Sequence, residues 1–239
     1  MIELDKVSKH FGSKVAVKEL SLHIPRGELF CFLGPNGAGK TTSIRMLCGL
    51  LQPTSGEVRI GGQRMHKDAV EVRRLMGYIP DTPFMYERLT PDEFMDFTGA
   101  LYGVPRERVQ AEKEQSFALF GLAEYRHNLI MELSHGLRQR VAYAATFLHD
   151  PQVLLVDEPF IGLDPHSIRL IRNLLKEKTR AGMTILLTTH ILALAEDLAD
   201  RIGIIMRGEL VALGGLDDLL RSHAVGDRLE DVFLHLTGD

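Results

Sequence analysis

An α/β fold is the class that this sequence predicts, with antiparallel strands near its N-terminus and an inserted helical subdomain. All-apolar, strand-sized runs such as Leu29–Leu33 and Val153–Val156 alternate with helical stretches in both halves of the chain. Strands without polar alternation are typical of a parallel sheet whose two faces are both covered. From Thr90 to about His149 the pattern is helical throughout. The alternation therefore predicts a doubly wound parallel sheet interrupted by a helical insertion.

Length, composition and charge set broad limits. The chain has 239 residues, enough for one large domain with a substantial core, and its net charge of -4 gives no indication of nucleic acid binding. Cys31 and Cys48 lie in apolar runs and are interpreted as buried, unpaired thiols of a reducing compartment. The apolar runs are far shorter than the roughly 18 residues that span a bilayer. We therefore expect no signal peptide and no membrane-spanning helix, so another chain must supply any membrane part.

Local spacing predicts the elements before the helical block. Short strand-like pieces separated by turns predict an antiparallel sheet edge that leads into the central strand at Leu29–Leu33. A helix is expected over about Lys40–Leu51, after that strand. The other expected strand pieces are Ile2–Leu4, Val15–Val17, Leu20–Ile24, Glu57–Ile60 and Leu75–Ile79.

The helical block opens at Thr90-Pro91-Asp92-Glu93, which combines an N-cap residue, a proline at the first helical position and acids in the first turn. A break at Gly103-Val104-Pro105 is followed by two more helical stretches. We therefore assign residues 82–149 to a helical subdomain, and 1–81 with 150–239 to the core. Further buried strands are expected at Thr184–Leu187 and Ile202–Met206.

The segment that carries the clearest chemistry is Gly34-Pro35-Asn36-Gly37-Ala38-Gly39-Lys40-Thr41-Thr42. It fits the phosphate-loop pattern G-x-x-x-x-G-K-[ST] between an expected strand and an expected helix. Its glycines let backbone N–H groups turn around a β-phosphate, and the helix directs its positive N-terminus at the same anion. Lys40 would reach the β- and γ-phosphates, and the Thr41 hydroxyl would ligate Mg²⁺. A glycine-rich turn without a ligand is the disfavoured alternative, so we predict a nucleoside triphosphate site.

Asp157 and Glu158 directly follow the apolar strand Val153–Val156, which we expect beside the strand that leads into the phosphate loop. The carboxyl end of such a strand is where a parallel sheet places ligands. Asp157 would hold Mg²⁺ directly or through water, and Glu158 would act as general base on the attacking water. Two solvated acids at a strand end are the alternative, which the phosphate loop upstream makes less plausible.

Together these features resemble the nucleotide-binding domain of ATP-binding-cassette (ABC) transporters over nearly the whole chain. Leu133–Arg140 resembles the signature motif of that family, Gly162–Pro165 resembles its D-loop, and Thr188–His190 resembles its switch-histidine motif. The resemblance implies a P-loop NTPase three-layer sandwich, with an antiparallel β subdomain and a helical subdomain that carries the signature motif. It also implies ATP and Mg²⁺ as cofactors.

The resemblance implies roles for individual residues as well. Phe11 would stack on adenine, and His190 would bind the γ-phosphate and hold the attacking water in line with Glu158. Ser134 and the N–H of Gly136 would head a helix starting near Leu137 and bind the γ-phosphate of an ATP held by a second subunit. Structural alternatives stay open: simple packing for Phe11, a satisfied polar group for His190 and an ordinary helix cap for Ser134.

The chain departs from the common form of the family at the Q-loop and in the signature. Asp81 stands where the family has Gln or Glu; it would ligate Mg²⁺ directly, reach it through water, or lead a helix away from the metal. In the signature, His135 replaces a glycine and Leu137 replaces a glutamine, while Ser134 and Gly136 remain. Exporter-type members of the family vary at the same places, so that branch is the better match.

As a whole, the resemblance implies an ATP-hydrolysing subunit that dimerises around two MgATP, with an identical or a different cassette as its partner. It would drive separate permease chains from the cytoplasmic face of the cell membrane, in export. The apolar segment Thr82–Tyr86 would meet the permease, unless it packs on its own domain. An apolar face with Leu229, Val232, Phe233 and Leu236 is expected to dock the C-terminal helix on the domain.

The rival function is a soluble cassette ATPase that is not coupled to a membrane chain and acts on nucleic acid or ribosomes. Proteins of that class usually carry a second phosphate loop, a long coiled-coil insertion or a basic face. The sequence shows none of these features. A nucleotide-regulated binding module without turnover is disfavoured by Glu158 and His190.

Overall fold

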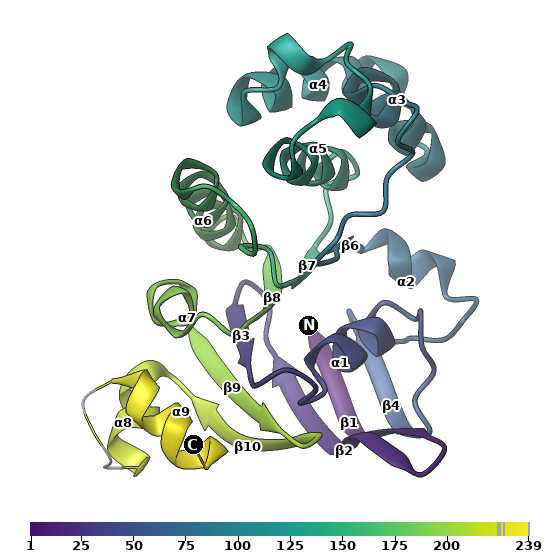
Figure 1. Cartoon of the computed structure of the whole chain (residues 1–239). Helices are drawn as coiled ribbons and strands as arrows, with labels where there is room; N and C mark the ends of the chain where they lie inside the picture. The colour runs from purple at the N-terminus through teal and green to yellow at the C-terminus, as the bar shows by residue number, and fades with distance from the viewer. Residues whose placement is uncertain (224–225, 227, 239) are drawn as a thin grey trace.

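The structure is a computed structural model that describes residues 1–223, 226 and 228–238. Its centre is a six-stranded sheet in the order β10-β9-β3-β8-β7-β6 (Figure 1). All neighbours pair in parallel except β10, which runs antiparallel to β9 at one edge. These strands are β3 (Leu29–Leu33), β6 (Met76–Ile79), β7 (Val153–Asp157), β8 (Thr184–Thr189), β9 (Arg201–Met206) and β10 (Glu209–Gly214). The predicted parallel sheet is thus confirmed.

One detail of the predicted strand order is wrong. β7 does not lie beside β3, because β8 pairs with β3 on one side and with β7 on the other. The carboxyl ends of these three strands therefore lie next to one another, with the end of β8 in the middle. Strand order depends on which faces pack together, and spacing along the chain carries no information about it.

A second sheet is antiparallel and has the order β2-β1-β4-β5. Its strands are β1 (Ile2–Phe11), β2 (Lys14–Ile24), β4 (Ser55–Ile60) and β5 (Gln63–Arg64). The predicted antiparallel β subdomain is thus confirmed, although its strands form a separate sheet rather than an edge that leads into the central strand. β1 and β2 are also longer than predicted, because register shifts and positive φ values at Lys6 (47°) and Glu19 (43°) interrupt the alternation within single strands.

Both faces of the parallel sheet are covered, as the apolar strands predicted. Along β3, Leu29, Cys31 and Leu33 belong to one hydrophobic cluster, while Phe30 and Phe32 belong to the other. The first cluster continues into α6 (Pro165–Arg180), α7 (Leu192–Leu198) and the helical block. The second fills the space toward α1 (Lys40–Leu47) and the antiparallel sheet. This arrangement confirms the predicted three-layer α/β fold.

The helical block consists of α3 (Pro91–Tyr102), α4 (Arg106–Phe120) and α5 (His135–Phe147), which lie together at the top of Figure 1. Two short 3-10 turns, Ala123–Tyr125 and Ile130–Glu132, connect α4 to α5. At the start of α3, Thr90 Oγ1 accepts a hydrogen bond from Glu93 N–H (3.2 Å) and Glu93 Oε2 accepts one from Thr90 N–H (2.9 Å). This reciprocal cap confirms the predicted helix start. The subdomain boundaries at residues 82–149 stay a prediction.

Several predicted boundaries shift. The helix predicted to reach Leu51 ends at Leu47, because Gly49 takes a left-handed conformation with φ of 68°. The signature helix begins at His135 rather than near Leu137, since Ser134 is its N-cap. The strand predicted from Leu75 begins at Met76, and the strand predicted to end at Leu187 continues to Thr189.

The remaining helices are α2 (Val70–Arg74), α8 (Leu216–His223) and α9 (Leu229–Thr237). In α9, Leu229 and Val232 are fully buried, which confirms that this helix docks on the domain. Cys31 and Cys48 are buried and unpaired, also as predicted. Within the described residues, no helix combines the length and the apolar character needed to cross a bilayer.

Candidate functional site

A cavity of about 530 Å³ opens where β3 and β8 end and α1 begins. Its walls include the phosphate loop from Pro35 to Thr42 and four side chains from distant parts of the chain. These four are Phe11, Asp81, Glu158 and His190. The predicted residues Gly34 and Asp157 are buried next to wall residues, whereas Ser134 and Gly136 are not part of the described wall. The fold thus brings most predicted site residues to one place.

Backbone geometry explains the glycines of the loop. A Cβ atom on Gly34 would lie 2.4 Å from the carbonyl oxygen of Ile205, and one on Gly39 would lie 2.6 Å from that of Ala16. Gly37 and Gly39 also have φ values of 80° and 117°, which other residues rarely adopt. α1 follows immediately, with Gly39 as its N-cap and no acid in its first turn. The positive N-terminal end of α1 is therefore not neutralised by an acidic side chain. It faces the loop, where it can bind an anion.

Lys40 supplies the positive charge of the site. Its side chain is only 7% exposed, and its ammonium lies 3.6 Å from Glu158 Oε1. It donates hydrogen bonds to the carbonyl oxygens of Gly34 (2.5 Å) and Pro35 (3.3 Å). Carbonyl oxygens are neutral, so they leave most of the charge on this buried cation available to an anion. A phosphate group in the loop can take over these contacts.

Glu158 is held in a strained conformation at the end of β7. Its φ of 49° lies in the left-handed region, where a residue with a side chain costs on the order of 1 kcal/mol or more. The backbone N–H donates to both the carbonyl oxygen and the hydroxyl of Thr188, each at 3.1 Å. Its Oε2 accepts a hydrogen bond from His190 N–H (3.3 Å) and lies 3.0 Å from His190 Nδ1. The structure therefore holds carboxylate and imidazole against each other at the cavity wall.

Asp157 provides a test of whether Mg²⁺ fits the site. This carboxylate is 1% exposed, and its Oδ1 accepts a hydrogen bond of 2.5 Å from the Thr188 hydroxyl. Its Oδ2 is buried without a hydrogen-bond partner among the described residues. A buried anionic oxygen without a partner is costly, and a cation removes that cost. Thr41 contributes a half-buried hydroxyl in the cavity wall, and oxygen ligands of this kind suit Mg²⁺.

No cluster of three or more histidine, cysteine or acidic side chains in the described ranges is arranged to hold a metal. Mg²⁺ usually takes one or two protein ligands and completes its shell with phosphates and water. Asp81 lines the cavity with an exposed side chain whose Oδ1 accepts a hydrogen bond from Thr82 N–H (2.8 Å). The side chains of Thr41, Asp157 and Asp81 are therefore compatible with a bound Mg²⁺.

Phe11, at the end of β1, is 50% exposed and lines the cavity. The Lys9 ammonium lies 5.3 Å from the centroid of its ring. A phenylalanine that served only the core would be buried, so its position suits contact with a planar ligand.

Ser134 and Gly136 lie at the N-terminus of α5. The Ser134 hydroxyl accepts a hydrogen bond from Leu137 N–H (3.3 Å), and its side chain is exposed. A Cβ atom on Gly136 would lie 3.6 Å from Asp164 Oδ2, so the first turn of α5 packs against the D-loop of the same chain. The structure thus brings Gly136 to Asp164, and neither Ser134 nor Gly136 lines the cavity at the phosphate loop of their own chain.

Three residues of the cavity were missed by sequence reasoning. Lys14 and Ala16 lie at the start of β2, and Ile161 follows Glu158 and is 46% exposed. Thr188 was noted only as part of a motif, although its hydroxyl bonds to both Asp157 and Glu158. The apolar Ile161, three positions after a predicted general base, was the one available signal. Nothing local indicated the others, which reach the site through strand pairing.

Comparisons with known proteins agree with this geometry. The model of the ABC transporter family matches residues 17–161, more than half of the chain. The linearmycin resistance ATP-binding protein LnrL of Bacillus subtilis is 35% identical over 219 residues, which cover 92% of this chain and 70% of that protein.

Two solved structures extend the agreement to three dimensions. The ATP-binding subunit of an ABC transporter has a TM-score of 0.93 at 32% identity and covers 99% of both chains. The ATP-binding cassette MJ0796, a dimer in a post-hydrolysis state bound to ADP and Pi, has a TM-score of 0.82 at 28% identity. That similarity covers 90% of this chain and 99% of the other. The P-loop NTPase fold is thereby confirmed, and the chain belongs to the ABC transporter family as one of its ATP-binding proteins.

Proposed function

We propose that this chain is the ATP-hydrolysing subunit of an exporter-type ABC transporter. Two such cassettes, identical or different, close around two MgATP and drive separate membrane chains. The observation that carries this proposal is the contact of Glu158 with both Lys40 and His190 beside the phosphate loop. A nucleotide-binding module without turnover has no need for a general base held in this way.

In the proposed reaction, ATP and water give ADP and phosphate. Thr41 and Asp157 would hold Mg²⁺, with Asp81 at the cavity wall as a further candidate, and a bound Mg²⁺ would supply positive charge against the phosphates. Lys40 exchanges its carbonyl partners for phosphate oxygens. Glu158 accepts a proton from the attacking water, and His190 orients that carboxylate and donates a hydrogen bond to the γ-phosphate. Phe11 stacks on the adenine ring.

The second half of the proposed site comes from another subunit. Ser134 and the N–H of Gly136 are at the N-terminus of a 13-residue helix, where an anion is stabilised, and the Ser134 side chain is exposed. A two-fold arrangement would place them against the γ-phosphate bound by the partner's loop. The dimeric state with ADP and Pi, reported for MJ0796, supports this arrangement.

An apolar groove beside α3 and α5 is the surface that we assign to the membrane chain. It has a volume of about 280 Å³, and its lining contains Phe84, Phe94 and Tyr102 but no acidic, lysine or arginine side chain among the described residues. Phe84 is 88% exposed, whereas Met85 is buried. Self-packing therefore accounts for Met85 but not for Phe84. A cytoplasmic helix with apolar anchors fits such a groove and would hold the chain at the inner face of the membrane.

Export is the direction that the sequence departures and the relatives favour. LnrL, a linearmycin resistance ATP-binding protein, matches over 92% of this chain. A membrane chain that co-purifies with this protein, and is lost from Phe84→Asp, supports the coupling. Retention of full ATPase activity with no membrane partner for either form would favour the uncoupled ATPase instead.

The catalytic part of the proposal is tested with Glu158→Gln. We expect hydrolysis to slow by about 100-fold or more, because the proton acceptor is lost, while MgATP still binds. Light scattering with saturating MgATP should then show a stable dimer. A variant that hydrolyses ATP at the wild-type rate would refute the role of Glu158, and one that binds MgATP but stays monomeric would refute the shared site.

A further inference from the structure

Arg140 on α5 connects three helices that the sequence did not link. Its Nη1 donates a hydrogen bond to the carbonyl oxygen of Phe120, the last residue of α4, at 3.1 Å. Its Nη2 donates to Ser167 Oγ on α6 at 2.8 Å and lies 3.5 Å from His166 Nδ1. α5 and α6 lie next to each other in Figure 1. A planar guanidinium with acceptors on two different helices fixes how those helices are placed.

Ser167 extends this connection to the D-loop. It is 1% exposed, and its hydroxyl donates a hydrogen bond of 2.5 Å to Asp164 Oδ2. Asp164 Oδ1 accepts hydrogen bonds from the N–H groups of His166 and Ser167, each at 3.0 Å, and so caps α6. The hydrogen bonds from Ser167 lower the pKa of Asp164 to about 2, so this residue is a carboxylate at neutral pH. A continuous chain of hydrogen bonds thus runs from Arg140 to Asp164.

The first turn of α5 touches the same segment directly. Gly136 and Arg140 are spaced i, i+4 and therefore lie on one face of the helix. A Cβ atom on Gly136 would lie 3.5 Å from Ser167 Oγ, and one on Gly162 would lie 3.6 Å from the His135 ring. The turn that carries Ser134 is consequently packed on the D-loop, with Arg140 one helical turn behind the contact.

We propose that Arg140 is a positioning residue that keeps the first turn of α5 and the D-loop together as one surface for the partner subunit's ATP. This inference rests on the proposed function, in which Ser134 and Gly136 act on a nucleotide held by a second chain. α5 belongs to the helical block, whereas the D-loop follows β7 of the parallel sheet. The hydrogen bond from Arg140 to Ser167 therefore connects the helical block with the segment that follows β7.

A purely structural role would be to cap the C-terminal end of α4 through Phe120. Ser167→Ala separates the two roles, because it removes the hydrogen bond between Arg140 and Ser167 and leaves the bond from Arg140 to Phe120. Arg140→Gln removes both hydrogen bonds, and Arg140→Lys keeps the positive charge without the planar guanidinium group. Lys176→Gln is the matched control, since it removes a cation of α6 that pairs with Asp197.

The first measurement is amide hydrogen exchange in the full-length chain without nucleotide. In Arg140→Gln and Ser167→Ala we expect the amides of His166 and Ser167 to exchange about tenfold faster, with Arg140→Lys in between. Lys176→Gln should leave their exchange rates within about twofold of wild type. Unchanged rates in Arg140→Gln would overturn the proposal.

The second measurement is MgATP-dependent dimerisation in the Glu158→Gln background, followed by light scattering. Arg140→Gln and Ser167→Ala should each weaken the dimer about tenfold, while the single chain binds MgATP as tightly as before. An undiminished dimer with a loosened D-loop would overturn the role of Arg140 in forming the surface. If Glu158→Gln alone fails to dimerise, the shared site itself is refuted, and hydrogen exchange still decides whether Arg140 holds the D-loop.

Discussion

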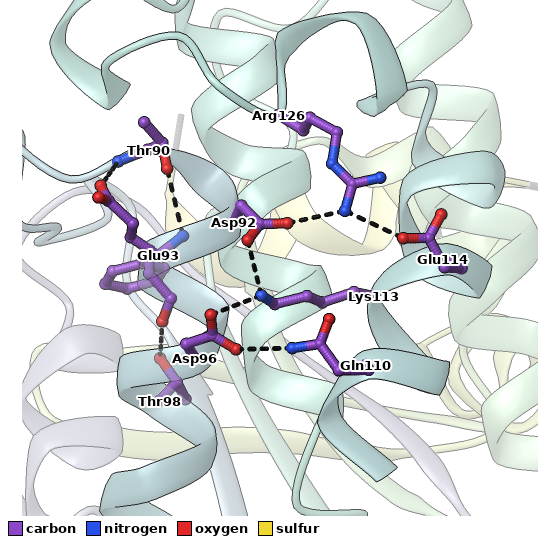
Figure 2. A network of polar contacts seen from close by, with 10 residues as sticks. Thr90, Asp92, Glu93, Asp96, Thr98, Gln110, Lys113, Glu114 and Arg126 are labelled. Carbon is purple, nitrogen blue, oxygen red and sulfur yellow. Dashed lines mark hydrogen bonds and ion pairs between the residues drawn. The ribbon is translucent and has the colours of Figure 1, made fainter. Parts of the chain in front are cut away.

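Two buried lysines lie in different regions of this molecule and have opposite surroundings. Lys113 on α4 is fully buried, with its ammonium 2.8 Å from Asp92 Oδ2 and 2.7 Å from Asp96 Oδ2 (Figure 2). Lys40 in the phosphate loop is nearly as buried, but its hydrogen bonds go to two carbonyl oxygens, and its nearest carboxylate, Glu158, is 3.6 Å away. Lys113 is thus paired with two carboxylates at hydrogen-bond distance, whereas Lys40 has a single, more distant one.

The helical network around Lys113 is closed on itself. Arg126 bonds to Asp92 and to Glu114, at 2.8 and 2.9 Å, and Gln110 donates to Asp96 at 3.1 Å (Figure 2). Burial alone would raise the pKa of Asp92, but the hydrogen bonds from Lys113 and Arg126 lower it. Such a network orders α3 against α4 and leaves neither of its two cations without a carboxylate partner. The comparison indicates that a buried cation signals a binding site when its hydrogen bonds go to neutral, exchangeable groups and its one carboxylate lies farther away.

Removing the helical lysine should have the largest effect on stability. Lys113→Met leaves Asp92 and Asp96 without their shared cation, so we expect the free energy of unfolding to fall by about 3 kcal/mol. Urea unfolding followed by circular dichroism measures this change. Lys176→Met, which breaks an exposed pair with Asp197, is the control and should cost less than about 1 kcal/mol. Equal losses in the two variants would show that the Lys113 network is no tighter than a surface pair.

Replacing Lys40 should instead lower the affinity for the nucleotide. For Lys40→Met we expect MgATP affinity to fall about 100-fold, or about 2.7 kcal/mol, because the phosphates lose their buried cation. The free energy of unfolding should change by less than half as much as in Lys113→Met, since Glu158 keeps its contacts with His190. Fluorescence titration and urea unfolding measure the two quantities. A stability loss as large as that of Lys113→Met, with MgATP affinity intact, would show that Lys40 serves stability rather than nucleotide binding.

Lowering the pH should reduce the stability that Asp92 contributes, by less than the Lys113→Met substitution does. Because the folded-state pKa of Asp92 is lowered, its contribution to stability is present above the unfolded pKa, about 3.9, and is lost as the pH falls through the folded value. The stability difference between wild type and Asp92→Asn should therefore shrink as the pH is lowered from 7 toward 3. Urea unfolding across that range tests it, and a difference independent of pH would contradict the assignment.

Prediction from sequence succeeded where the relevant interactions are local. The reciprocal cap of Thr90 and Glu93 involves residues three apart, and the loop before Lys40 needs glycines for its own backbone. It made no prediction for Lys113, because nothing in α4 indicates that Asp92 and Asp96 of α3 lie opposite that residue. It also left Phe84 undecided, since exposure depends on what packs over a residue and not on its own character.

By itself, the sequence determined the parallel α/β class, the phosphate loop and the acids at the end of β7. Runs of apolar residues, turn glycines and helix caps specify these features within a few positions of the chain. Only the tertiary structure decided that β8 lies between β3 and β7, and that His190 therefore contacts Glu158. It likewise gave Lys40 two neutral hydrogen-bond partners and one carboxylate at 3.6 Å, and gave Lys113 two carboxylates at hydrogen-bond distance. The physical reason is that strand order and charge pairing depend on faces that meet across long stretches of chain, where local preferences exert no control.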